Sequence, residues 1–247
     1  MKKQTKALVI LVVTVLVVLT SAPAWAMHIS EGILPVQWAA LWFALSIPFV
    51  ALGLRNLRAR SLEDPQYKVL VGLVGAAVFV ISCMPIPVPS AGTCSHPCGT
   101  GMAAILIGPA VTVVVASIAL VLQALFLAHG GLTTLGADIF SMGVAGAYVG
   151  YGVFLLARKV RLSLFAAAFL AGLFSDWATY TVTSFELATA LHGEVSLSTM
   201  FFAILVAFVP TQVPLGIVEG FIAGGAYKFV HERRPELLRL LPNRGVQ

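Results

Sequence analysis

Residues 84–109, MPIPVPSAGTCSHPCGTGMAAILIGP, decide the fold because they interrupt an otherwise apolar chain twice. The three alternating prolines at the start of this stretch fix their own φ angles and disfavour a helical conformation in each preceding residue. Gly108-Pro109 is the second interruption, because proline removes a backbone donor and glycine loosens the turn. We therefore predict an irregular, extended segment over 85–99 and then a short helix that breaks at Gly108-Pro109.

Long apolar blocks lie on both sides of this stretch. They cover residues 36–54, 69–84, 100–128, 136–157, 162–191 and 199–230. Each block is long enough to cross a hydrocarbon core of about 30 Å. The chain of 247 residues is 59% hydrophobic and only 10% charged, which excludes a water-soluble globular domain. The pattern predicts an all-α polytopic membrane helix bundle.

The basic residues beyond position 26 form three clusters between these blocks. The clusters are Arg55, Arg58, Arg60 and Lys68; Arg158, Lys159 and Arg161; and Lys228, Arg233, Arg234, Arg239 and Arg244. The positive-inside rule puts all three in the cytoplasm, so the net charge of +5 reports topology rather than nucleic-acid binding. Block 100–128 must then cross twice, which its length permits only if one crossing is short or broken. We predict seven crossings with a short or broken third helix, the N-terminus outside and the C-terminus inside.

The first 26 residues have the layout of a secretory signal peptide. Lys2, Lys3 and Lys6 precede an apolar stretch, and Ala24-Trp25-Ala26 offers a small-x-small cleavage site. The alternative is an uncleaved first transmembrane helix. Cleavage after Ala26 would leave 27–247 as a single membrane-embedded domain that begins at Met27.

The new N-terminus would be a metal chelate. The α-amine of Met27, the amide nitrogen of His28 and the His28 imidazole can close two rings around one ion, leaving a fourth position open. His96, in the irregular outer segment, is the candidate for that position. Four nitrogens in a plane suit Ni(II), Cu(II) or low-spin Co(II) better than Zn(II), which prefers a tetrahedron. Met27, His28 and His96 are therefore the predicted metal ligands.

Two cysteines, Cys94 and Cys98, flank His96 and leave three interpretations open. They could form a disulfide on the oxidising outer side, act as soft metal ligands, or be small buried thiols without a role.

Carboxylates inside the apolar blocks need partners, because a charge at the bilayer centre is costly. Asp176 falls near the middle of its block and could orient an imidazole at the metal site or simply pack through a hydrogen bond. Ser95, next to His96, is a second candidate for such a supporting role. Glu219 follows Pro210 and Pro214, and we expect it to serve a subunit contact or to reach the membrane interface.

Several motifs together resemble the CbiM/NikM family. They are Met27-His28-Ile29 with Glu31-Gly32-Ile33-Leu34-Pro35, Ser95-His96-Pro97 with Gly99-Thr100-Gly101, His129-Gly130-Gly131-Leu132-Thr133-Thr134-Leu135-Gly136, and Phe140-Ser141-Met142-Gly143. Members of this family are the metal-capturing membrane subunits of energy-coupling-factor transporters for cobalt and nickel. This sequence departs from the family pattern in two ways. Its leader must be removed to expose the Met-His end, and cysteines flank His96 where serine or threonine is expected.

The resemblance implies the same ligands, namely the Met27 amine, the amide and imidazole of His28, and His96. It also implies a transmembrane scaffold subunit, cytoplasmic ATPase subunits, often a small accessory membrane protein, and a location in the plasma (inner) membrane. The transported ion would be cobalt(II), supplied for cobalamin synthesis, with nickel(II) as the alternative.

The leading function is therefore capture of Co(II) or Ni(II) for an ATP-driven importer. The sequence has no Gly-x-x-x-x-Gly-Lys-Ser/Thr pattern, so ATP hydrolysis of the P-loop kind must come from partners. A competing function is an intramembrane enzyme that uses Asp176 or a cysteine with a histidine base. A third is a structural membrane subunit without a ligand, which leaves the processed Met-His end unexplained.

Overall fold

The computed structural model describes residues 29–84, 86–87, 94–127 and 129–238. The helices run in the order α2 (Val36–Glu63), α3 (Gln66–Ser82), α4 (Thr100–Ile107), α5 (Pro109–Phe126), α6 (Leu135–Asp138), η1 (Ile139–Gly146), α7 (Ala147–Lys159), α8 (Leu164–Leu191), α9 (Leu197–Arg233) and α10 (Pro235–Leu238). The predicted leader, Met27 and His28 lie outside the described residues.

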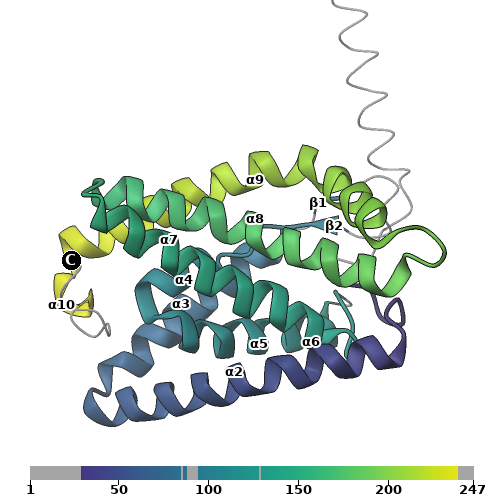
Figure 1. Cartoon of the computed structure of the whole chain (residues 1–247). Coiled ribbons are helices and arrows are strands. Elements are labelled where there is room, and N and C mark those ends of the chain that lie inside the picture. The colour runs from purple at the N-terminus through teal and green to yellow at the C-terminus, as the bar shows by residue number, and fades with distance from the viewer. Residues whose placement is uncertain (1–28, 85, 88–93, 128, 239–247) are drawn as a thin grey trace, which may run out of the picture.

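The helices follow the predicted blocks and form an all-α membrane bundle (Figure 1). Within the described ranges, four segments are long and apolar enough to cross a membrane, namely Val36–Glu63, Pro109–Phe126, Leu135–Lys159 and Leu197–Arg233. The 17-residue α3 is a shorter apolar helix. The 28-residue α8 is long enough to span but carries polar side chains on its buried face, including Ser175, Asp176 and Glu186.

The third crossing is short, as predicted. Helix α4 has eight residues, which rise about 12 Å at 1.5 Å per residue. All eight residues are buried, as expected for a helix that is apolar on every side. The buried, irregular segment Ser95–Gly99 leads into α4. Its backbone polar groups can lie inside the bundle only because protein groups replace water as their partners.

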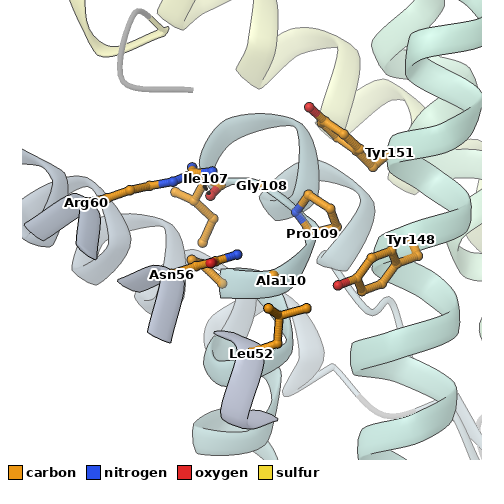
Figure 2. Close-up of a pocket in the computed structure, with 10 residues that line it drawn as sticks. Leu52, Asn56, Arg60, Ile107, Gly108, Pro109, Ala110, Tyr148 and Tyr151 are labelled. Atoms are coloured by element: carbon orange, nitrogen blue, oxygen red, sulfur yellow. Dashed lines mark hydrogen bonds between the residues drawn. The ribbon is translucent and has the colours of Figure 1, made fainter. Parts of the chain in front are cut away.

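The predicted break occurs at Gly108, between α4 and α5. Gly108 adopts φ 87° and ψ 149°, a conformation open in practice only to glycine, and Pro109 begins α5. The carbonyl oxygen of Ile107 accepts a hydrogen bond from the Tyr67 hydroxyl at 2.6 Å and from Arg60 at 3.5 Å. Figure 2 shows Arg60 reaching toward this turn, beside a cavity of about 250 Å³.

The described basic residues gather at one end of the molecule. The α2–α3 turn, the α7–α8 turn and the end of α9 lie together at the left in Figure 1 and carry the three clusters defined above, except for Arg239 and Arg244, which lie outside the described residues. This is the arrangement that the sequence requires if block 100–128 crosses twice. The opposite end holds the strands, α6 and the α8–α9 turn.

Two features refine the prediction. The extended segment forms a minimal antiparallel ladder, with β1 (Ile86–Pro87) paired to β2 (Cys94–Ser95). The π-helix η1 lies inside the continuous helical run Leu135–Lys159 and was not predicted, because hydrophobic periodicity does not distinguish a π turn from an α turn.

Candidate metal site

His96 is buried, with 2% of its surface exposed, and its backbone is fixed by one tyrosine. The Tyr180 hydroxyl, on α8, accepts a hydrogen bond from the His96 amide at 3.0 Å and donates to the His96 carbonyl oxygen at 3.1 Å. The two rings meet edge to face, with centroids 6.2 Å apart. A rigid α8 thus sets the position of the predicted loop ligand.

The tautomer of His96 follows from its own hydrogen bond. Nδ1 lies 3.0 Å from the carbonyl oxygen of Pro97, and a carbonyl oxygen can only accept. Nδ1 therefore carries the proton, and the lone pair of the neutral ring is on Nε2. A backbone carbonyl bound to one ring nitrogen is the usual way in which a metal-binding imidazole is oriented.

Glu219, on α9, clamps the segment that follows His96. Its Oε1 accepts from the amide of Cys98, and its Oε2 accepts from the amide of Gly99 at 3.0 Å. Gly99 has φ 69°, which favours glycine, and it turns the chain into α4. Only 2% of Glu219 is exposed, so the expectation of a subunit contact or an interfacial position was wrong.

Asp176, at the middle of α8 as predicted, is fully buried and has polar partners on α9. In the orientation that satisfies both of its ends, the Gln212 amide donates to the two Asp176 oxygens at 3.1 and 3.0 Å and accepts from the Ser95 hydroxyl at 2.7 Å. Asp176 and Ser95 therefore support the loop that carries His96, through Gln212.

Cys98 brings a sulfur to the same two acids. Its Sγ and carboxylate oxygens of Asp176 and Glu219 lie within 4.8 Å of one another, and all three residues are buried. These donors could hold a divalent ion. Cys98 is a free cysteine, so the disulfide with Cys94 is absent. The side chain of Cys94 lies outside what the structure describes.

The N-terminal segment is anchored by a second acid, Asp138 of α6. The amide of Ile29, the first described residue, donates to Asp138 Oδ1 at 3.1 Å. The carbonyl oxygen of Ile29 accepts from the Thr134 hydroxyl at 2.6 Å. The Ile29 side chain is buried with Leu34 and Leu187.

Glu31 fastens the same segment at the surface. Its carboxylate accepts from the hydroxyl of Thr133 at 2.5 Å and from the amide of Thr133 at 3.2 Å. These hydrogen bonds hold the pKa of Glu31 below its usual value of 4.5. Gly131 lies against Glu31 so closely that a Cβ there would come within 2.6 Å of the Glu31 Cα.

The sequence reasoning missed two buried acids, Asp138 and Glu186. Glu186, on α8, has no exposed surface, and neither carboxylate oxygen has a hydrogen-bond partner among the described residues. Both acids stand in apolar blocks, so their position in the sequence marks them, like Asp176, as charged groups that need partners.

Helix α8 joins the two parts of the predicted site. Tyr180 holds His96, and Leu187, seven residues on, belongs to the same buried hydrophobic cluster as Ile29. Seven residues are two turns, about 10 Å along a helix, so Tyr180 and Leu187 fall on one face of α8. Met27 and His28 lie outside the described residues, whereas the hydrogen bonds that anchor Ile29 and the segment Ser95–Gly99 lie within them.

Comparison with known proteins points to one family. A family model named CbiM, "Cobalt uptake substrate-specific transmembrane region", matches residues 28–237. The cobalt transport protein CbiM of Sorangium cellulosum is 59% identical over 212 residues, covering 86% of this chain and 94% of that protein. The corresponding protein of Geobacter sulfurreducens is 58% identical over 220 residues, covering 89% of this chain but 64% of that protein, which is less than two thirds of its length.

Solved structures agree in architecture. A truncated transition metal transporter superposes with a TM-score of 0.73 at 26% identity, covering 83% of this chain and 99% of that one. A second transition metal transporter gives a TM-score of 0.72 at 25% identity, covering 89% and 100% of the two chains.

Proposed function

Because the chain belongs to the CbiM family, the substrate-specific transmembrane region of cobalt uptake, we propose that it captures Co(II) outside the membrane for import. The family is a membrane transporter component and not an enzyme, so the alternative of an intramembrane enzyme is dropped. The observation that carries the proposal is the His96 loop, which is buried and held by Tyr180 and Glu219.

The proposed ligands are the Met27 amine, the amide and imidazole nitrogens of His28, and Nε2 of His96. The Nδ1 contact of His96 supports this set, because it leaves the lone pair on Nε2. The bonds that Ile29 makes to Asp138 and Thr134 support it too, because they anchor the chain immediately after His28. Removal of residues 1–26 would expose the amine.

The proposed orientation has the N-terminus outside and the basic end in the cytoplasm. All described Lys and Arg clusters lie at the end opposite α6 and β2, which supports this orientation through the positive-inside rule. The metal site would then face the outer side of the plasma (inner) membrane.

Transport would need partners. We assign ATP hydrolysis to cytoplasmic ATPase subunits, coupled through a transmembrane scaffold subunit and assisted by a small accessory membrane protein. The partners must open the site into a state of weaker affinity, because an ion bound equally well in both states is not delivered. The imported cobalt would supply cobalamin synthesis, and Ni(II) is the second candidate cargo because the same four nitrogens suit it.

The test is to extend the mature N-terminus by one residue ahead of Met27 and, separately, to make His96→Ala. Metal content by mass spectrometry should fall to background in both, while expression is retained. His231→Ala, at the basic end of α9, is the matched control and should bind normally. Retention of metal by the extended protein would refute the chelate, and retention by His96→Ala would remove His96 from the site.

The absorption spectrum of the cobalt-loaded protein tests the remaining interpretations of Cys98. A planar four-nitrogen spectrum without a thiolate charge-transfer band would make Cys98 a buried thiol beside the site. A thiolate band that Cys98→Ser removes, and Cys83→Ser leaves, would make it a ligand.

A further inference from the structure

A groove of about 710 Å³ lies between the end of α2 and the start of α3, away from the metal site. It is lined by Leu54, Leu57, Arg58, Ser61, Leu62, Lys68, Val71 and Gly72. The residues from α2 recur at helical spacing, and so do those from α3. The groove is therefore the seam between two antiparallel helices.

Most of the groove surface is aliphatic, and glycine keeps it open. A Cβ placed on Gly72 would meet no atom within 4 Å. Leu54 and Leu62 are 52% and 76% exposed, so no other described part of the chain covers the seam. The volume falls in the range of sites that hold a small molecule.

The groove also contains one hydroxyl without a partner. Ser61 is 6% exposed, and its Oγ makes no hydrogen bond in the described chain. A buried polar group left unpaired costs free energy, so the Ser61 hydroxyl gains a partner if its side chain turns toward a ligand oxygen in the groove.

Two cations belong to the same groove. Arg58 and Lys68 are exposed, and neither forms an ion pair with a described carboxylate. They stand at the basic end of the bundle, where the α2–α3 turn lies beside the other basic clusters (Figure 1). The groove therefore offers an apolar floor, an unpaired hydroxyl and two unpaired positive charges.

We propose that this groove binds an anionic phospholipid of the leaflet that contacts the basic end. One acyl chain lies on the leucines and in the space over Gly72. The phosphate is bound by Arg58 and Lys68 and accepts a hydrogen bond from Ser61. This lipid site is independent of the metal-capture function.

The positive charges of Arg58 and Lys68 and the aliphatic surface of the groove together favour an anionic phospholipid as the ligand. Basic side chains near an anionic membrane surface are attracted to its lipids. Basic pockets between membrane helices on the cytoplasmic side bind lipid head groups. A zwitterionic lipid would fill the floor without the net charge that Arg58 and Lys68 complement. A free phosphate ion would use the charges but leave the floor exposed.

The experiment measures lipid binding to the full-length purified protein by native mass spectrometry and by the midpoint of thermal unfolding. Phosphatidylglycerol, phosphatidylcholine and inorganic phosphate are added separately. We expect saturable binding of phosphatidylglycerol, a higher unfolding midpoint, and a preference over phosphatidylcholine that falls roughly thirtyfold in Arg58→Gln/Lys68→Gln. Arg55→Gln, at the same end but outside the groove, is the control and keeps the preference.

Gly72→Leu adds a Cβ that meets no atom within 4 Å and directs further side-chain atoms toward the groove, so the variant should fold and lose the bound lipid. Equal binding of both lipids, equal protection by inorganic phosphate, or unchanged binding in Gly72→Leu would each overturn the proposal. A third outcome would also overturn the proposal: the wild-type protein binds no lipid, and Gly72→Leu loses only its assembly with a partner subunit. That outcome would assign the groove to the partner subunit.

Discussion

At the scale of single residues, two carboxylates fix the two parts of the proposed metal site in the same way. Glu219 accepts from the amides of Cys98 and Gly99, just after His96, and Asp138 accepts from the amide of Ile29, just after His28. Each carboxylate holds backbone rather than a ligand side chain. We therefore expect them to be positioning residues that limit how far the neighbouring proposed ligand can move.

Glu219→Gln tests this at the loop. The two backbone amides each donate to a different carboxylate oxygen, and glutamine replaces one of these oxygens by an NH₂ group, so in this geometry one buried N–H loses its acceptor. We expect metal affinity to fall by about 10–100-fold, the usual effect of removing a residue that orients a ligand, with expression retained. Isothermal titration with Co(II) measures it. Glu232→Gln, in the exposed pair with Lys228, is the control and should change nothing.

Glu31 gives a prediction for pH. Its pKa is held below 4.5 by the Thr133 hydrogen bonds, so its contribution to stability is fully present above the unfolded-state value and is lost as pH falls through the folded-state value. At pH 7 the unfolding temperature of wild type should therefore exceed that of Glu31→Gln, and this difference should shrink as pH falls below the unfolded-state pKa of about 4.3. A difference that stays constant as the pH is lowered further would contradict this. Glu194→Gln, in the exposed α8–α9 turn, is the control, and its unfolding temperature should equal that of wild type at both pH values.

At the scale of elements, the short third crossing depends on the turn between α4 and α5. Tyr67 and Arg60 bind the end of α4 at Ile107, and Glu219 binds the segment before its start. Helix α4 is therefore fixed at both ends.

Gly108→Ala should destabilise the protein by about 1–3 kcal/mol, because φ 87° with ψ 149° is strained for a residue with a Cβ. Thermal unfolding in detergent measures the loss. Gly152→Ala is the matched control, since its Cβ meets nothing within 4 Å in an ordinary helix, and it should be neutral or slightly stabilising. Equal effects of the two substitutions would show that the break does not need glycine.

At the scale of the whole molecule, the described basic clusters and the proposed metal site lie at opposite ends. If the basic end faces the cytoplasm, a membrane-impermeant maleimide applied to intact cells should label Glu194→Cys and fail to label Lys159→Cys. Permeabilised cells should allow both to react. The reverse pattern would invert the orientation and place the metal site inside the cell. The unsubstituted protein reports the background from its native cysteines.

The sequence by itself determined the bundle, its apolar blocks, the extended proline segment and the break at Gly108. These follow from hydropathy and from proline and glycine chemistry, which are local properties of the chain. It also singled out His96 and Asp176 as polar groups that need an explanation.

Only the tertiary structure decided which groups hold His96. Tyr180 and Glu219 lie 84 and 121 positions from their partners in the loop, and Asp138 lies 109 positions from Ile29. No periodicity encodes such pairs, because they arise where α6, α8 and α9 pack against the irregular segments. Glu219 illustrates both contributions. Its position in an apolar block of the sequence indicates that its carboxylate needs a partner. Only the packing of the helices determines that this partner is the backbone after His96.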